Sequence, residues 1–437
     1  MVLWMPYCPG EGASAPTKVD SYPTHDSMPP ILDVESGTLV AFQAQKRGEE
    51  ANSFECSQVC ENDVAQVIIV CEPDLHNNLM GALHPNGALY EAPVNMTKAS
   101  SQHEGLRRML RDNGVKVLTV REILLFGCSS SIHHRVALED LAGSRLTYEL
   151  DDDETPGEES EFYTGNAYKK EVLEQMSAEQ LVDVVLCKPT VKVRHSFRDT
   201  GFTASYSFKP LTNLQFTRDQ QITTARGIVL SRMRSSQRQH EVDVMKFCFK
   251  KLGLKVVGAV EAPGFLEGGD FFPGGSERCF FGVGVRSNVE AVQQLMLQDL
   301  CGTNKVVVVK DELDRSQDRM HLDCYFNIIS SNCVLLLDEA MGVDAPLHRV
   351  VDEYEKRAPL PGERGQRFGE YLLVKKNIEF SVYLHNECGY NIITLTKQEQ
   401  LAYACNCLNL GGGRILSCHL ESARRIVRSP FFNGDMQ

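Results

Sequence analysis

The sequence predicts an α/β fold built from similar strand–helix–strand units, and two observations carry this prediction. Apolar runs of strand length alternate with stretches whose apolar residues follow a helical period. Helix start and stop signals, such as the capping-box spacing Ser177-Ala178-Glu179-Gln180 and the turn Asn113-Gly114, lie between them. Such repetition implies one α/β domain of similar modules. A doubly wound sheet would give the same signals, so periodicity alone does not distinguish it from a ring of modules.

The first unit follows a polar leader. Residues 1–62 are rich in Pro, Ser, Gly and Glu without sustained periodicity, so we expect a disordered leader there. The globular part, residues 63–437, opens with Val67–Val70, which reads as a buried strand. A helix over Gln102–Arg111 and a strand over Lys116–Val120 complete the unit.

A partly helical insertion is expected at about residues 130–195. Within it, the acidic run from Glu149 to Glu161 is most simply a solvated loop. The capping-box spacing at Ser177 predicts a helix over Leu181–Leu186.

From Gly227 the unit repeats. The expected elements are strands at 228–230, 255–258, 279–283 and 305–309, helices at about 239–251 and 287–300, and less regular repeats around 334–337, 379–384 and 401–408.

Composition argues against several classes of protein. The 437 residues, 42% of them hydrophobic, can bury one large core or two modest ones. The net charge of -13 argues against a nucleic-acid partner and suits a small cationic ligand better. Since no uninterrupted apolar run of membrane-spanning length is present, we expect no membrane partner and interpret the chain as cytoplasmic. The sequence leaves open whether the chain forms a homo-oligomer.

The 15 cysteines form neither a Cys-x-x-Cys pair nor a His/Cys cluster with zinc spacing. We therefore expect no disulfide framework, no metal and no cofactor, and we interpret most cysteines as small buried apolar residues.

The first of three short motifs that suggest chemistry is Asn213-Leu214-Gln215-Phe216-Thr217-Arg218-Asp219. An apolar stretch ends there in Arg218 and Asp219, and a partly buried carboxylate at that place could accept two N–H groups of a guanidinium. A salt bridge from Asp219 to a nearby arginine is the alternative interpretation.

The second motif is Glu267-Gly268-Gly269-Asp270, whose glycines allow a sharp turn that could place both carboxylates on one cavity. Gly-Gly is also a common plain turn. In the third, His321-Leu322-Asp323, extended backbone would project the imidazole and the carboxylate from one face, where Asp could bind substrate while His moves protons. A surface strand with a polar face is the alternative there.

In their order and approximate spacing, these three motifs resemble the signature of the arginine deiminase family. The resemblance covers about residues 64–430, including the helical insertion that marks this family among its relatives. Further matches are Pro210 before the first motif, Arg238 with Glu241 after it, Arg286-Ser287-Asn288 after a Gly-Val-Gly strand, and Met320 before His321.

The resemblance implies a five-bladed α/β propeller, the pentein fold, with L-arginine in its central cavity. Asp219 and Asp323 would hold the guanidinium, whereas Asn213, Arg238 and Arg286 would hold the amino-acid end.

The resemblance also implies the chemistry. A cysteine thiolate would attack the guanidinium carbon while Glu267 and His321 shuttle protons. Ammonia would leave, and water would convert the covalent amidine intermediate to L-citrulline. No metal is required.

In the family, a Gly-rich turn near the C-terminus carries the nucleophile, and this sequence departs from that pattern. One alignment makes Cys418, after Gly411-Gly412-Gly413, the nucleophile. In the alignment that we favour, the three glycines are the turn between strands at 404–408 and 414–417, Cys418 starts a helix, and 434–437 begins another strand. The segment with the nucleophile is then absent, through truncation or because the protein is a non-catalytic relative. Three other cysteines are more typical of the core: Cys388, Cys405 and Cys407.

The sequence is therefore interpreted as a hydrolase that converts L-arginine and water to L-citrulline and ammonia. Dimethylarginine hydrolases and amidinotransferases are near alternatives, and the insertion with Phe-Thr-Arg-Asp favours the deiminase. An arginine-binding or scaffolding relative without a nucleophile is the alternative of another class. Because all four charged residues of the pocket are present, we expect arginine to bind even without turnover: Asp219, Glu267, His321 and Asp323.

Overall fold

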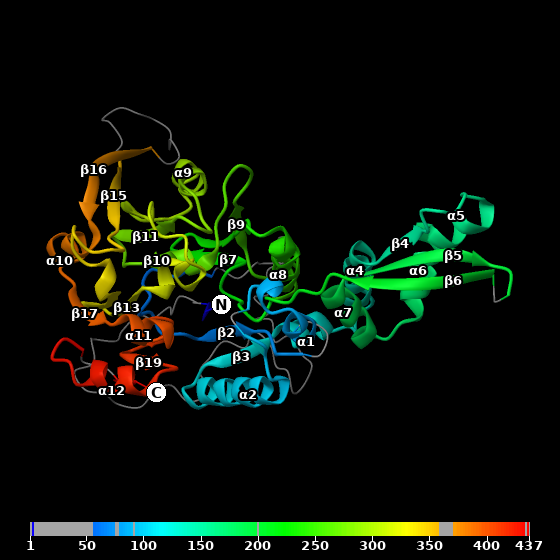
Figure 1. Ribbon diagram of the computed structural model, residues 1–437, viewed down its shortest axis with the longest axis horizontal. Coiled ribbons are helices and arrows are strands. Elements are labelled where there is room, and N and C mark those ends of the chain that lie inside the picture. The colour runs from blue at the N-terminus through cyan, green and yellow to red at the C-terminus, as the bar shows by residue number, and fades with distance from the viewer. Residues whose placement is uncertain are drawn as a thin grey trace, which may run out of the picture.

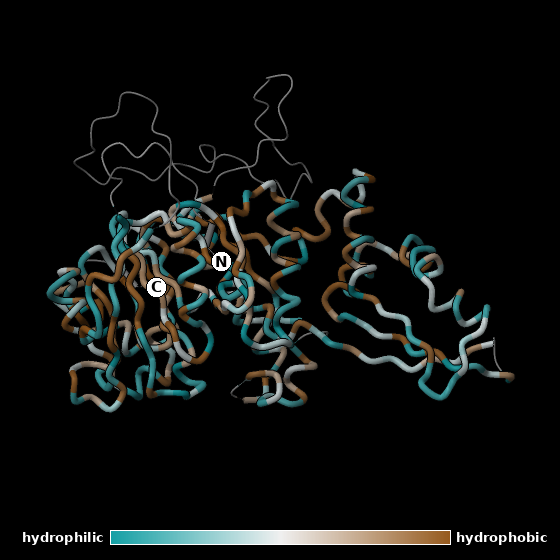
Figure 2. The backbone as a smooth tube through the Cα atoms, turned by 90° about the horizontal axis from the view of Figure 1, so that it is seen from above, coloured by the Kyte–Doolittle hydropathy of each residue, from teal (hydrophilic) through white to brown (hydrophobic). Residues whose placement is uncertain are grey.

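The computed structural model describes residues 2–3, 56–74, 78–90, 92–198, 201–357, 370–432 and 435–436. A main body of several small sheets carries a lobe that projects to one side (Figure 1). Seen from above, the lobe extends well away from the main body (Figure 2). The expected α/β class is confirmed, since strands and helices alternate along most of this described chain.

Five of the six sheets among the described residues repeat one pattern. The first strand pairs antiparallel with the second, and the second pairs parallel with the third. The sheets are β1 (Val2–Leu3), β2 (Val67–Val70) and β3 (Lys116–Thr119); β7 (Gln221–Thr224), β8 (Gly227–Leu230) and β9 (Val256–Ala259); β10 (Phe271–Pro273), β11 (Arg278–Val283) and β12 (Lys305–Lys310); β13 (Phe326–Ser330), β14 (Cys333–Leu337) and β17 (Asn391–Leu395); and β18 (Leu408–Gly411), β19 (Arg414–Leu416) and β20 (Asp435–Met436).

Helices lie in the connections between the second and third strands, because parallel neighbours need a crossover. In the third sheet, β15 (Val350–Lys356) and β16 (Tyr371–Glu379) continue beyond β12. The helices of the main body are α1 (Asn78–Leu83), α2 (Met96–Asp112), α3 (Val120–Leu125), α8 (Gln239–Lys251), α9 (Val289–Leu297), α10 (Phe380–Asn386), α11 (Lys397–Leu401) and α12 (Leu420–Val427).

The middle strands hold the core. Every residue of β2, β8 and β14 is buried, which explains why these segments are continuous apolar runs instead of alternating ones. The predicted helix over 239–251 matches α8, and the helix predicted from Gln102 begins earlier, at Met96, because Asn95 caps it. None of the helices in the described ranges combines the length and the apolar character needed to cross a bilayer.

Residues 56–65 bridge the first strands of three sheets. The backbone N–H groups of Gln58, Glu61 and Ala65 donate to carbonyl oxygens of Thr224, Pro273 and Leu410, at 3.0, 2.9 and 3.0 Å. The predicted leader therefore ends too late at residue 62, since residues 56–62 belong to the packed body. The rest of the leader lies outside the described residues, apart from the two residues of β1.

The lobe comprises the insertion, and it is longer than expected. It runs from α4 (Ile132–Arg145) through β6 (Gly201–Phe208), so the end predicted at residue 195 falls inside a hairpin. Its other elements are β4 (Thr147–Leu150), α5 (Glu158–Thr164), α6 (Asn166–Gln175), α7 (Ala178–Cys187) and β5 (Pro189–Ser196).

The acidic run is only partly a loop. Its ends belong to β4 and α5, and only residues between them lie in turns or coil. Helix α5 is ordered by aromatic packing: the ring of Tyr163 lies 5.0 Å from that of Tyr168 and 5.4 Å from that of Phe202. The expectation of a solvated loop was therefore wrong for residues 158–161.

In the last sheet the glycine turn is confirmed, since Gly411 pairs with Arg414 across it and all three glycines have positive φ. The strand expected at 404–408 lies at 408–411 instead, because a turn with a left-handed Tyr403 follows α11. The helix expected at Cys418 begins at Leu420, and the side chain of His419 caps it. The strand expected at 434–437 is present as Asp435–Met436, whose two flanking residues lie outside the described chain.

Candidate active site

Three turns carry the three motifs, and each turn leads into the first strand of a sheet. Asp219 precedes β7, the 3-10 turn Gly268–Asp270 precedes β10, and the 3-10 turn Leu322–Cys324 precedes β13. Backbone contacts join them: Gly268 N–H donates to the carbonyl of Asp219 at 3.2 Å. Each motif thus has the same place before the first strand of its sheet, and motifs far apart in the chain come into contact.

A buried imidazole–carboxylate pair lies in this cluster. His321 Nε2 is 2.9 Å from Glu267 Oε2, and the two side chains are 4% and 0% exposed. Burial alone would lower the pKa of His321, but Glu267, Asp219 and Asp270 outweigh it and raise this pKa to about 10. Burial would raise the pKa of Glu267, but His321, Arg238 and Arg286 outweigh it and lower this pKa to about 2. Both shifts favour the charged pair, an imidazolium beside a carboxylate, near neutral pH.

His321 and Asp323 do share one side, although not by the expected geometry. The backbone of His321 is extended, but Asp323 lies in the 3-10 turn that follows, so the two residues do not share one extended strand. An ideal β-carbon on Gly269 would lie 2.6 Å from His321 Nδ1 and 3.0 Å from Asp323 Oδ2. Glycine at position 269 is what allows both side chains to approach the turn that carries Glu267.

A buried arginine crosses the cluster. Arg238 Nη1 lies 2.9 Å from Asp219 Oδ2, and Nη2 lies 2.9 Å from Glu241 Oε2. The same guanidinium donates to the carbonyl of Asn213 at 3.3 Å and lies 4.0 Å from Glu267 Oε2. Asp219 therefore forms the salt bridge that was the alternative interpretation of its motif, and its partner is Arg238.

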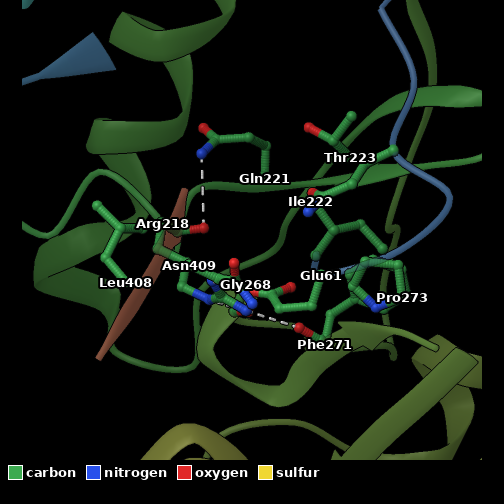
Figure 3. A pocket seen from close by; sticks show the side chains of 11 residues that line it. Glu61, Arg218, Gln221, Ile222, Thr223, Gly268, Phe271, Pro273, Leu408 and Asn409 are labelled. Carbon is green, nitrogen blue, oxygen red and sulfur yellow. Dashed lines mark hydrogen bonds and ion pairs between the residues drawn. The ribbon is translucent and has the colours of Figure 1, made fainter. Parts of the chain in front are cut away.

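Asp323 lies beside a second arginine. Arg218 Nε is 3.8 Å from Asp323 Oδ2 and donates to the carbonyl of Gly268 at 3.1 Å, while Nη2 donates to the carbonyl of Phe271 at 2.9 Å (Figure 3). Burial raises the pKa of Asp323, which the charges of His321 and Arg218 only partly offset. Arg218 also lines a cavity of about 90 Å³.

Glu61 is a residue of this cavity that the sequence did not single out, since it lay in the predicted leader. Its carboxylate lies 3.3 Å from Arg218 Nη1, and its side chain is 7% exposed. Burial raises the pKa of Glu61, and the charge of Arg218 offsets this rise only in part. Gln221 and Asn409 also line the cavity (Figure 3).

Asp270 holds the turn of His321 instead of facing the cluster. Its two carboxylate oxygens accept from Ser287 Oγ at 2.5 Å and from the backbone N–H of Leu322 at 2.9 Å. Burial raises its pKa to about 7. Asp270 therefore positions His321 by fixing the backbone next to it.

The remaining predicted binding residues border the cluster. The Asn213 side chain donates to the carbonyl of Ala88 at 2.9 Å, so it is fixed by the backbone of the preceding unit. Arg286 Nη2 donates to Gln317 at 3.1 Å, and its Nε is buried without a hydrogen-bond partner. The Nε–H group of Arg286 is therefore free to donate a hydrogen bond to a ligand.

The cysteines differ in their distance from this cluster and in their burial. Cys418 is exposed, and its Sγ contacts the carbonyls of Ala402 and Tyr403 at 3.8 and 3.3 Å. Burial of the thiol nonetheless raises its pKa. Cys324 Sγ lies 3.7 Å from Asp323 Oδ1, inside the cluster. The other cysteines expected in the core occupy it or border it: Cys405 and Cys407 are buried, and Cys388 is half-buried.

Among the described residues, no set of three or more His, Cys, Asp and Glu side chains is placed to hold a metal ion.

Replacing His321 by Gln should destabilise the protein most near neutral and mildly acidic pH. The folded-state pKa of His321 is about 10 against an ordinary 6.5, so its contribution is complete below 6.5 and is lost as pH rises toward 10. We expect the difference in unfolding free energy between the wild type and His321→Gln to fall over that window, as measured by urea unfolding at stepped pH. A difference that grows with pH would contradict a charged His321.

The fold and the site together define an α/β protein with a buried imidazole–carboxylate pair and two further carboxylates, each beside an arginine. The sequence matches the profile of the arginine deiminase family over residues 87–423, which is more than half of the chain. The chain belongs to the arginine deiminase family.

Two curated relatives are arginine deiminases of staphylococci. That of Staphylococcus haemolyticus is 25% identical over 260 residues, which are 56% of this chain and 60% of that enzyme. That of Staphylococcus aureus strain MRSA252 is 22% identical over 284 residues, which are 62% of this chain and 66% of that enzyme. The chain thus matches less than two thirds of the length of these relatives.

Solved structures of partial similarity include two arginine-related enzymes. The dimethylarginine hydrolase (DDAH) of Pseudomonas aeruginosa, in complex with citrulline, has a TM-score of 0.44 and 15% identity, and the match covers 85% of this chain and 91% of that chain. The N-terminal domain of ArgZ, a cyanobacterial arginine dihydrolase, has a TM-score of 0.47 and 14% identity. The match covers 85% of this chain and 89% of that chain.

Proposed function

We propose that this protein binds L-arginine and hydrolyses a C–N bond of its guanidino group, giving L-citrulline and ammonia. The observation that carries the proposal is the meeting of Asp219, Glu267, His321 and Asp323 in one cluster, on turns that lead into three separate sheets. The first three are buried and Asp323 is half-buried. Family membership supports the same reaction.

In this proposal Asp219 and Asp323 hold the substrate guanidinium, because carboxylates accept the parallel N–H groups of that planar cation. Asn213, Arg238 and Arg286 hold the amino-acid end. Without substrate, Arg238 forms an ion pair with Asp219. The substrate guanidinium would replace Arg238 there, and Arg238 could then bind the carboxylate of the substrate.

Glu267 and His321 would move the protons. A thiolate adds to the guanidinium carbon, a proton is delivered to the departing nitrogen, and ammonia leaves. Water then adds to the amidine carbon, gives up a proton, and the carbon–sulfur bond breaks to release citrulline. The 2.9 Å contact of His321 with Glu267 supports this role, since it links two groups of opposite charge through one hydrogen bond.

A binding protein without turnover is the second candidate. It is favoured by the place of Cys418, whose Sγ contacts the backbone carbonyls of Ala402 and Tyr403. Cys324 has a contact with Asp323, which makes it the matched residue for a test of the nucleophile.

We also propose that the five sheets of shared topology are the five blades of a pentein propeller. The repeated pairing and the position of residues 56–65 across the first strands of three sheets support this arrangement.

Arginine binding can be tested by thermal unfolding. We expect L-arginine to raise the melting temperature of the wild type, by the equivalent of about 2.7 kcal/mol at a hundredfold excess over Kd. Asp219→Asn should abolish the rise because the guanidinium loses its charged acceptor. Asp152→Asn, in the lobe and 88% exposed, is the control that should keep it. An Asp219→Asn protein stabilised as strongly as the wild type would remove Asp219 from the site.

Turnover is tested separately by release of citrulline and ammonia from L-arginine, with Cys418→Ser and Cys324→Ser alongside the wild type. Release lost in Cys418→Ser alone makes Cys418 the nucleophile, and release lost in Cys324→Ser alone makes it Cys324. No release from the wild type, with stabilisation by arginine intact, supports the binding protein instead.

A further inference from the structure

A second group of charged side chains lies where the lobe joins the main body. Arg145 ends α4, Lys188 follows α7 and Lys209 follows β6, all from the lobe. Arg145 and Lys188 contact His240 on α8 of the main body, and the ends of α4 and α7 lie near α8 (Figure 1). The backbone N–H of Lys209 donates to the carbonyl of Lys188 at 3.3 Å, so the two lysines are neighbours.

The hydrogen bonds in this group do not balance. Arg145 Nη1 lies 2.9 Å from His240 Nδ1, and Lys188 Nζ contacts His240 Nε2. A neutral imidazole has one acceptor nitrogen and one N–H group, and a protonated one has no acceptor. Two cationic donors therefore compete for at most one lone pair, and at least one of them faces a nitrogen that cannot accept from it.

The charges do not balance either. The carboxylate of Asp243 lies 3.0 Å from Arg145 Nη2 and 3.9 Å from His240 Nδ1, but its side chain is 57% exposed. Burial, with the charges of Arg145 and Lys209, lowers the pKa of Lys188. Burial, with the charges of Lys188 and Arg145, lowers the pKa of His240. Both directions are those of positive groups that repel one another.

One buried donor in the group also lacks an acceptor. Arg145 Nε is buried without a hydrogen-bond partner, and the Arg145 side chain is only 7% exposed. A buried guanidinium donor without a partner costs free energy, which a ligand with acceptor oxygens would recover. Lys188 is half-buried and His240 is 39% exposed, so the group stays open to solvent on its outer side.

We propose that Arg145, Lys188 and His240 form a binding site for a small oxyanion of the phosphate type. Its deprotonated oxygens accept hydrogen bonds, so one anion can take the surplus N–H groups of all three side chains. The site is independent of the charged cluster around His321 and of the proposed reaction. It joins α4 and α7 of the lobe to α8, which begins directly after Arg238, so a bound anion would fasten the lobe to the helix next to the candidate active site.

The test measures the melting temperature of the full chain in potassium phosphate, sulfate or chloride at one pH and one ionic strength. We expect phosphate to raise it above the value in chloride, and calorimetric titration with phosphate to show saturable binding. Lys188→Met should weaken that binding about tenfold or more, because one charged hydrogen bond is lost. Lys192→Met removes a charge from the same lobe, where Lys192 pairs with Asp152, and should leave it unchanged.

His240→Gln provides a second variant with the same expected loss, should Lys188→Met fail to fold. Adenosine monophosphate in place of phosphate separates the two sources of this chemistry, since tighter binding of the nucleotide would assign the site to phosphate esters instead of free phosphate. Equal melting temperatures in phosphate and chloride, or binding retained in Lys188→Met and His240→Gln, would overturn the proposal.

Discussion

Gly268→Ala is expected to destabilise the protein by about 3 kcal/mol or more, the upper part of the range for overpacked cores. An ideal β-carbon on Gly268 would lie 2.0 Å from the carbonyl oxygen of Arg218 and 2.7 Å from that of Gln221. Both atoms belong to the backbone, so no rotamer change can relieve the collision. The turns that carry Asp219 and Glu267 would have to separate, and arginine binding should be lost together with stability.

Gly105→Ala is the matched control. Gly105 lies inside α2, and its added β-carbon would meet no atom within 4 Å. Since alanine favours a helix over glycine, this variant should be more stable by about 0.5–1 kcal/mol. Urea unfolding of both variants measures the two shifts. A Gly268→Ala protein as stable as the wild type would show that the turns do not approach as closely as described.

Arg238→Leu should cost about 3–5 kcal/mol, the range for removing one partner of a buried ion pair. The guanidinium lies between Asp219 and Glu241, and the side chains of these three residues are 4%, 9% and 1% exposed. Without it, two buried carboxylates face each other with no cation between them. We expect the loss of unfolding free energy to be smaller at acidic pH, where the carboxylates can be protonated.

The double variant Arg238→Leu/Glu241→Leu tests this explanation. Replacing a buried charge and its partner by apolar side chains is tolerated better than removing one partner, so the double variant should be more stable than Arg238→Leu. Arg234→Leu is the control, since Arg234 is exposed and stacks on Phe265, which is worth about 1 kcal/mol at most. If the loss of unfolding free energy in the double variant is the sum of the separate losses, the Glu241 carboxylate does not destabilise the protein once Arg238 is gone.

The repeated units of the fold could be predicted because their signals are local. Val67–Val70 and Gly227–Leu230 are apolar runs because middle strands are covered on both faces. Predictions failed where tertiary contacts decide the structure. Helix α5 forms inside an acidic run because its aromatic residues pack on the hairpin of the lobe, and residues 56–65 are ordered because their backbone bonds to three sheets.

The candidate site was predicted in parts. The residues of the three motifs were identified because their types and spacing resemble a family signature, and the structure brings Asp219, Glu267, His321 and Asp323 together. Their partners were not all predictable. Glu61 reaches Arg218 from a segment without any pattern of its own, and Cys324 is next to Asp323 in the chain but has no motif around it.

The sequence by itself determined the α/β class, the order of the units and the family, because periodicity, caps and motifs act over a few residues. Only the tertiary structure decided that Arg238 lies on Asp219, that Asp270 supports the turn of His321, and that the lobe brings Arg145 and Lys188 to His240. Arg238 and Asp219 are 19 positions apart in the chain, and Asp270 is 52 positions from Leu322. His240 is 95 positions from Arg145 and 52 from Lys188. Their geometry follows from how whole sheets and the lobe pack, which no local pattern records.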